Sequence, residues 1–179
     1  MKKAILTCFA AWVLLTIIPF NIVAQKAKLV SQRITLAEIS WSKSVSNRPG
    51  SGMQPGLETV FIAGDGNEKE LFSLVFKVPA NTAIQPHSHP DDRSCFVLSG
   101  LWYFGYGTAR DEAKLKALPP GSNYTEPAST VHFAGTKDQE AIVECTGVGP
   151  TGTTFVNPAD DRATKSDRAK CGSYARAKA

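Results

Sequence analysis

The stretch Pro86–Gly100 (PHSHPDDRSCFVLSG) places two histidines, His87 and His89, two positions apart in a segment of extended composition. Side chains at positions i and i+2 of a β-strand point to the same face, so both imidazoles can be directed at one point. The third histidine of the sequence, His132, follows a second turn-rich segment, and there is no fourth. Imidazoles brought together in this way are a typical ligand set for a transition metal. The stretch therefore predicts a strand that supplies two metal ligands.

The N-terminus has the pattern of a secretory signal peptide. Lys2 and Lys3 precede an apolar run over residues 4–20, and small residues follow near Ala24. We expect cleavage after Ala24, and removal of the two lysines lowers the formal net charge from +4 to +2. The alternative is an uncleaved membrane anchor over residues 5–23, because this run is nearly long enough for a bilayer core of about 30 Å. We expect an exported protein, periplasmic or secreted, with no membrane partner after cleavage and no nucleic-acid partner.

The cysteines do not follow a metal-binding or redox motif. Cys8 lies in the expected signal segment, so the mature chain keeps Cys95, Cys145 and Cys171. No C-x-x-C spacing occurs, so the usual patterns of zinc knuckles and dithiol redox sites are missing. An odd number of cysteines in an exported protein leaves at least one thiol outside any internal disulfide.

Beyond residue 54, short segments of strand composition alternate with turns. Leu57–Ala63 (LETVFIA) and Leu71–Val78 (LFSLVFKV) flank the turn residues GDGN and predict a β-hairpin. Residues 108–118 form the one expected helical or loop excursion. Many short strands separated by Gly and Pro turns predict an all-β barrel or sandwich. The expected regions are a signal peptide (1–24), an N-terminal arm (25–54), a β-barrel (55–158) and a polar C-terminal tail (159–179).

The histidine stretch resembles the first motif of the cupin superfamily, G(X)5HXH(X)3-4E(X)6G. His87, His89 and Gly100 match, and Asn81 replaces the opening glycine, a mild change because Asn tolerates left-handed backbone angles. Residues 121–136 are similar to the second motif, G(X)5PXG(X)2H(X)3N. There Gly121, Pro127 and His132 match, while Ser129 and Thr136 replace the second glycine and the final asparagine. The resemblance implies a double-stranded β-helix, or jelly roll, with a divalent metal on His87, His89 and His132.

The glutamate that cupins usually contribute as a fourth ligand is missing. Its position falls on Arg93, or on Ser94 with the longer spacing, and neither is an ordinary metal ligand. Glu126 and Asp92 are the possible substitutes. Asp92 lies next to the expected position, but a shift of one residue along a strand reverses the face, so it would need a β-bulge. The ligand set suits Fe, Zn, Mn, Ni or Cu, and the sequence does not select among them.

Arg93 has two interpretations. It can pair with Asp91 or Asp92, or it can point inward and hold a substrate carboxylate with its two-pronged guanidinium. An arginine in the ligand shell also repels a divalent cation, so the alternative for the three histidines is a cupin that no longer binds metal.

The cupin resemblance places the strands that carry Cys95 and Cys145 side by side. A disulfide between them can form outside the cytoplasm, but its geometry is demanding, and we expect buried free thiols. Trp102, Phe104 and Tyr106 alternate on one face of a strand and are expected either to pack in the core or to line a pocket.

The first functional hypothesis is a metal-dependent exported enzyme that acts on a small organic molecule, with an anionic substrate if Arg93 orients it. Dioxygenation is favoured over lyase or isomerase chemistry, with Tyr103 or Tyr106 as a proton donor. A serine hydrolase is disfavoured because no G-x-S-x-G elbow is present. The second hypothesis is a non-catalytic cupin that binds or senses a small molecule, because a fold does not fix a function. A homodimer is an open possibility under both hypotheses.

Overall fold

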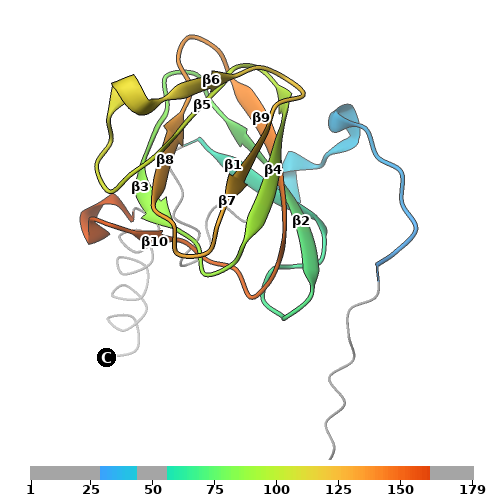
Figure 1. Ribbon diagram of the computed structural model, residues 1–179. Helices are drawn as coiled ribbons and strands as arrows, with labels where there is room; N and C mark the ends of the chain where they lie inside the picture. The colour runs from blue at the N-terminus through green and yellow to red at the C-terminus, as the bar shows by residue number, and fades with distance from the viewer. Residues whose placement is uncertain (1–28, 44–55, 162–179) are drawn as a thin grey trace, which may run out of the picture.

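The computed structural model describes residues 29–43 and 56–161 and shows two five-stranded antiparallel sheets facing each other (Figure 1). The strand orders are β1-β2-β9-β4-β7 and β10-β3-β8-β5-β6. The strands are β1 (Glu58–Ala63), β2 (Leu71–Val78), β3 (Ala83–Ser88), β4 (Arg93–Ser99), β5 (Trp102–Tyr106), β6 (Lys116–Leu118), β7 (Asn123–Glu126), β8 (His132–Gly135), β9 (Ala141–Val148) and β10 (Thr154–Phe155). The helical elements of the described residues are short 3₁₀ turns: η1 (Leu36–Glu38), η2 (Trp41–Lys43), η3 (Glu112–Lys114) and η4 (Pro158–Asp160). The predicted signal segment lies outside the described residues, as does most of the predicted tail.

The core lies between the two sheets, where every second residue of a strand points inward. Strand β9 alternates buried and half-buried residues along most of its length. Phe76 of β2 meets Trp102 of β5 edge to face with ring centroids 5.7 Å apart, so aromatic rings from both sheets meet in the middle. Trp102 and Phe104 are therefore core residues, whereas Tyr106 on the same face is 46% exposed at the end of the strand.

The predicted hairpin is confirmed by the antiparallel pairing of β1 with β2. The excursion after β5 differs in part from the prediction. Its helical content is the single 3₁₀ turn η3, capped by the Asp111 carboxylate, which accepts a hydrogen bond from the Ala113 amide at 3.0 Å. The last part of the excursion is strand β6, which pairs antiparallel with β5. Its residue Leu118 enters the core, while Lys116 and Ala117 stay exposed.

Two non-glycine residues have left-handed backbone angles where the cupin motifs carry glycine. They are Asn81, with φ +56°, and Ser129, with φ +61°. Both close turns that lead into a site-bearing strand, and the Ser129 amide donates to the carbonyl of His89 at 2.7 Å. The replaced glycines therefore mark required turn geometry, which the substituents adopt at some cost in free energy.

The expectation of free thiols at Cys95 and Cys145 is wrong. The two cysteines are direct cross-strand partners on β4 and β9, with Cα atoms 4.1 Å apart, and they form a buried disulfide. Opposed residues of a non-hydrogen-bonded antiparallel pair approach this closely, and this register is not readable from the sequence. The crosslink joins residues 50 positions apart, which in the chain-entropy account stabilises the fold by about 4 kcal/mol.

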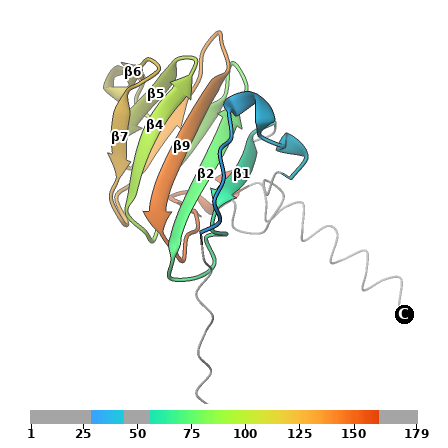
Figure 2. The same ribbon diagram turned by 90° about the vertical axis from the view of Figure 1, so that its right-hand side faces the viewer.

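The described part of the N-terminal arm, residues 29–43, runs along the outside of the β1–β2 end of its sheet (Figure 2). Ile39 packs there with Val60 and Val75 in a small second cluster, and the Lys77 ammonium lies 4.5 Å from the centre of the Trp41 ring.

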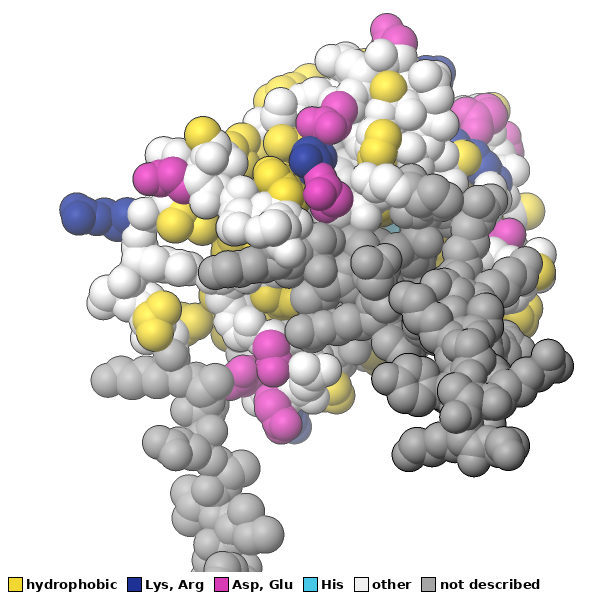
Figure 3. Space-filling view, turned by 180° about the vertical axis from the view of Figure 1, so that it is seen from behind, with side chains coloured by type: hydrophobic (Ala, Val, Ile, Leu, Met, Phe, Trp, Pro, Cys, Tyr) yellow, Lys and Arg dark blue, Asp and Glu magenta, His cyan; other side chains and the backbone are white. Residues whose placement is uncertain are grey.

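None of the described residues belongs to a helix long and apolar enough to cross a membrane. On the face in Figure 3, acidic, basic and hydrophobic side chains are interspersed, which does not favour a nucleic-acid interface.

Candidate metal centre

The three histidines come together on the inner side of one sheet. His87 on β3 and His132 on β8 are cross-strand partners, and His89 follows directly after β3. Their ring centroids are 4.4 Å (His87–His132), 5.0 Å (His87–His89) and 5.1 Å (His89–His132) apart. One nitrogen from each ring lies within 4.8 Å of the others, and all three residues are buried. The sequence spacing thus predicted the grouping correctly.

Each imidazole is oriented by a backbone carbonyl at its Nδ1 atom. The acceptors are the carbonyls of Gln85 for His87 (2.7 Å), Gly152 for His89 (2.6 Å) and Thr130 for His132 (3.0 Å). A ring that donates from Nδ1 leaves Nε2 as a lone pair, which is the state a metal requires. The Nε2 atom of His132 is buried and has no hydrogen-bond partner among the described residues. The donor set therefore fits a metal ion.

Burial keeps the imidazoles of His87 and His89 neutral. It lowers the pKa of His87 to about 3, with further lowering from the charges of His132 and Arg93. The pKa of His89 is also well below its usual value, again mainly because of burial and next because of Arg93. Uncharged rings are ready to act as ligands without losing a proton.

Glu126 brings a carboxylate to the histidines. It is buried on β7, with one oxygen 3.3 Å from Nε2 of His89 and the other 3.7 Å from Nε2 of His132. Asp92 lies elsewhere, because it is exposed and accepts a hydrogen bond from the Ala128 amide at 2.7 Å. Of the two predicted substitutes for the missing glutamate, the structure thus places only Glu126 beside the histidines.

Arg93 points inward and is the direct cross-strand partner of Glu126. Its Nε donates to the buried carboxylate of Asp91 at 2.9 Å, and its Nη1 lies 3.5 Å from Glu126. Its Nη2 donates to the Thr151 hydroxyl and lies 3.4 Å from the Gly152 carbonyl. The predicted pair with Asp91 is confirmed, whereas Asp92 is not a partner. The guanidinium is enclosed by acceptors of the protein itself.

The two tyrosines predicted as proton donors lie apart from the histidine rings. Tyr103 is paired with Gly135 and belongs to the outer face of its sheet, away from the inward His132. Tyr106 is the cross-strand partner of His132, but its hydroxyl donates to the carbonyl of Thr125 at 2.6 Å. Neither hydroxyl forms a hydrogen bond with an imidazole of the described residues.

Sequence reasoning missed Tyr124. It is buried two residues before Glu126 on the same face of β7, with its ring centroid 4.3 Å from that of Phe104. Burial raises its pKa well above 10, and the neighbouring charge of Glu126 raises it further. Phe104 in turn stacks on His132 at 5.3 Å, so the rings form a continuous wall beside the site. The i, i+2 spacing of Tyr124 and Glu126 was the available signal.

Comparisons with protein-family models and with curated proteins found no match. Among solved structures, a polyketide cyclase (RemF) from Streptomyces resistomycificus has a TM-score of 0.55, with 16% identity over 76% of this chain and 94% of the cyclase. The chain has the cupin fold. A cupin-like protein from Thermotoga maritima has a TM-score of 0.46, with 16% identity over 59% of this chain and 82% of its own chain.

A DMSP lyase (DddQ) from Ruegeria pomeroyi has a TM-score of 0.50 and is 20% identical over 65% of this chain. The match covers 58% of the lyase, so the chain spans little more than half of that enzyme's length. At these identities the likeness concerns the fold alone.

Proposed function

We propose that this protein is an exported, metal-dependent cupin enzyme that acts on a small organic molecule. His87, His89, His132 and Glu126 hold the metal, a divalent ion of Fe, Zn, Mn, Ni or Cu. The observation that carries the proposal is the set of three buried imidazoles, each fixed at Nδ1 by a carbonyl, with a carboxylate 3.3 and 3.7 Å from two of their Nε2 atoms. Such a mixed nitrogen and oxygen set suits these ions.

The charges around the site favour a cation in spite of Arg93. Asp91 and Glu126 contribute two negative charges and Arg93 one positive charge, so the cluster carries a net charge of −1 when its histidines are neutral. The repulsion expected from an arginine in the ligand shell is thus offset by the two carboxylates that it contacts. Arg93 helps to hold the Glu126 carboxylate, because its Nη1 lies 3.5 Å from the oxygen that is near His89, as an outer-shell partner does in many metal sites.

When bound, a divalent metal supplies a Lewis acid that polarises a substrate oxygen. The chain supplies the ring orientation through three carbonyls, the placement of Glu126 through Arg93, and an aromatic wall of Phe104 and Tyr124. Two predicted roles stay predictions: Tyr106 as a proton donor and Arg93 as a ligand of a substrate anion. Each side chain already has a partner within the protein, which it would have to release in order to bind substrate.

The metal decides the reaction class. Dioxygenation is our first choice with iron, because a site of histidines and a carboxylate with open positions supports oxygen chemistry. With a redox-inert ion such as zinc, the site is limited to Lewis-acid reactions of the lyase or cyclase type. The similar solved structures are by name a cyclase and a lyase, which supports keeping this second class in the test.

Export is supported by the Cys95–Cys145 disulfide, because such bonds persist mainly in oxidising compartments. A homodimer remains a prediction.

A non-catalytic cupin that binds a small molecule is the second candidate function. It is favoured because the hydrogen-bond donors of Arg93 already contact groups of the protein, which leaves few free polar groups beside the histidines.

Metal analysis of the purified mature protein tests the proposal. We expect about one bound metal ion per chain in the wild type and its loss in His87→Ala and His132→Ala, because each variant removes a ligand. Tyr103→Phe is the matched control, because Tyr103 lies on the outer face of its sheet and should leave the metal content unchanged. A wild-type protein that holds no metal after incubation with Fe(II), Zn(II), Mn(II), Ni(II) or Cu(II) would refute the proposal. A loaded protein without turnover on any small organic acid would favour the non-catalytic candidate.

A further inference from the structure

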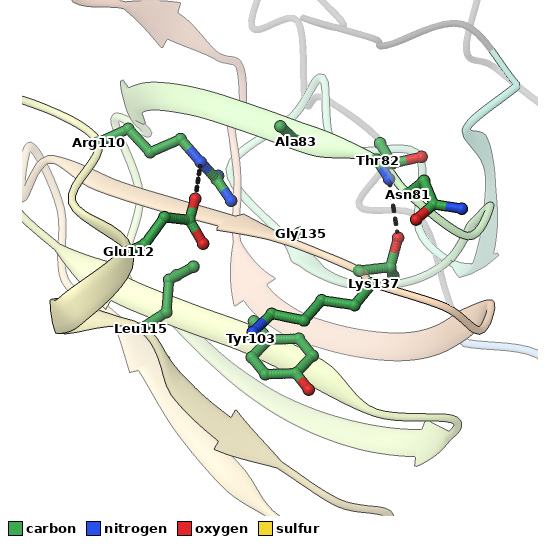
Figure 4. A pocket seen from close by; sticks show the side chains of 10 residues that line it. Asn81, Thr82, Ala83, Tyr103, Arg110, Glu112, Leu115, Gly135 and Lys137 are labelled. Atoms are coloured by element: carbon green, nitrogen blue, oxygen red, sulfur yellow. Dashed lines mark hydrogen bonds and ion pairs between the residues drawn. The ribbon is translucent and has the colours of Figure 1, made fainter.

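A second polar pocket lies on the outer face of the β10-β3-β8-β5-β6 sheet, away from the metal centre (Figure 4). It has a cavity volume of about 240 Å³. Ala83, Gly135 and Tyr103 are successive cross-strand neighbours on β3, β8 and β5 and form its base. Because the strand alternates, Gly135 belongs to the face opposite His132 and Ala134 is the inward residue between them. The sheet therefore separates this pocket from the histidines.

One cation of the pocket is Lys137, whose ammonium lies 4.5 Å from the centre of the Tyr103 ring. Figure 4 shows its side chain extended across the pocket toward that ring. Among the described residues, no carboxylate lies within ion-pair distance of Lys137 and no group forms a hydrogen bond with the Tyr103 hydroxyl. The aromatic face thus positions an ammonium whose N–H groups remain available.

The second cation is Arg110, which is held rigidly. Its Nη1 donates to the carbonyls of Ala134 at 2.7 Å and Ile84 at 3.2 Å, and its Nε pairs with Glu112 at 2.8 Å. Its Nη2 has no hydrogen-bond partner in the part of the chain that the structure describes, and it lies 3.4 Å from where a Cβ atom of residue 135 would be. A Cβ atom at position 135 would clash with the Thr82 carbonyl oxygen, so glycine is required there, and no side chain of residue 135 covers Nη2.

The polar groups favour a specific ligand chemistry. Lys137 and Nη2 of Arg110 provide positive donors for an anion, and the guanidinium edge suits a carboxylate. The Glu112 carboxylate and the Asn81 side chain at the rim offer acceptors that a simple anion would not use but that hydroxyl groups would. We propose that this pocket binds a small hydroxylated carboxylate about the size of a six-carbon sugar acid. The site is additional to the proposed metal centre and does not depend on it.

The test is a titration of the 15N-labelled mature protein followed by amide chemical shifts, with three probes that differ in one feature each. D-gluconate has both a carboxylate and hydroxyl groups, sorbitol is the same chain without the carboxylate, and hexanoate lacks the hydroxyl groups. We expect gluconate to shift the amides of residues 81–83 and 135–137 with a Kd on the order of 1 mM, since the cavity is small. Sorbitol and hexanoate should bind at least about tenfold more weakly.

Lys137→Gln should weaken gluconate binding by about tenfold, whereas Lys116→Gln, which removes an exposed lysine outside the pocket, should not. His132→Ala should also leave gluconate binding unchanged, which separates this inference from the metal proposal. The inference is overturned if gluconate shifts no amide of the pocket or if sorbitol binds equally well. It is also overturned if the two lysine variants weaken binding to the same extent, because the effect would then come from net charge alone.

Discussion

Two arginines show how differently the inside and the outside of this barrel use positive charge. Arg93 is inside, with a side chain that is 8% exposed, and its donors contact two buried carboxylates, a hydroxyl and a carbonyl. Arg110 is outside and pairs with Glu112, whose side chain is 65% exposed, while one of its nitrogens stays open. The inner arginine is part of a balanced cluster, and the outer one still has a donor to offer.

The difference follows from solvation. A buried charge is tolerated only when opposite charges and hydrogen bonds replace the lost water, so the interior has matched Arg93 with Asp91 and Glu126. On the outer face water supplies that compensation, so Arg110 and Lys137 can remain incompletely paired. The same residue type thus supports a cation site inside, by holding a carboxylate, and an anion site outside, by direct contact.

Replacing each arginine with methionine in the metal-free protein should give the largest contrast. Arg93→Met should lower the free energy of unfolding by about 3–5 kcal/mol, because it removes the positive charge that compensates the buried carboxylates of Asp91 and Glu126. Arg110→Met should cost about 1 kcal/mol, because it removes hydrogen bonds to two carbonyls and an exposed ion pair. Urea unfolding with a chelator present measures both. Equal losses would show that the two regions do not differ in this way.

The two carboxylates weighed as substitutes for the missing glutamate provide the next contrast. Glu126→Gln should weaken metal binding by at least about tenfold, or about 1.4 kcal/mol, because it removes a charged oxygen beside His89 and His132. Asp92→Asn should leave the affinity unchanged, since its oxygen can still accept from the Ala128 amide. Competition with a chromophoric chelator gives the affinities. A loss of equal size in Asp92→Asn would argue against Glu126 as the ligand.

The smallest expected effect concerns the two left-handed residues, one beside each region. Ser129→Gly, next to the metal centre, should raise the free energy of unfolding by about 0.5–1 kcal/mol, because a φ of +61° is energetically unfavourable for serine but not for glycine. Asn81→Gly, at the rim of the outer pocket, should change it by only a few tenths of a kcal/mol, as asparagine tolerates this conformation. Thermal unfolding of both variants measures the difference, and a gain at Asn81 as large as at Ser129 would contradict it.

The sequence by itself determined the strands, the turns and the three histidines. Period-two alternation and turn residues are local properties, so the hairpin of residues 57–78, the barrel class and the i, i+2 arrangement of His87 and His89 could be predicted from neighbouring residues. The resemblance to the cupin motif predicted Asn81 as a replacement for glycine, and its positive φ confirms this.

Only the tertiary structure decided which residues meet across strands. The register of β4 against β7 and β9 placed Arg93 opposite Glu126 and Cys95 opposite Cys145, which selected Glu126 over Asp92 and formed the disulfide. In the other sheet, the pairing of β5 with β8 set Tyr103 beside Gly135 on the outer face, where it lines a second pocket. A shift of one residue in register would reverse each of these outcomes, and register depends on the packing of the whole barrel rather than on any single stretch.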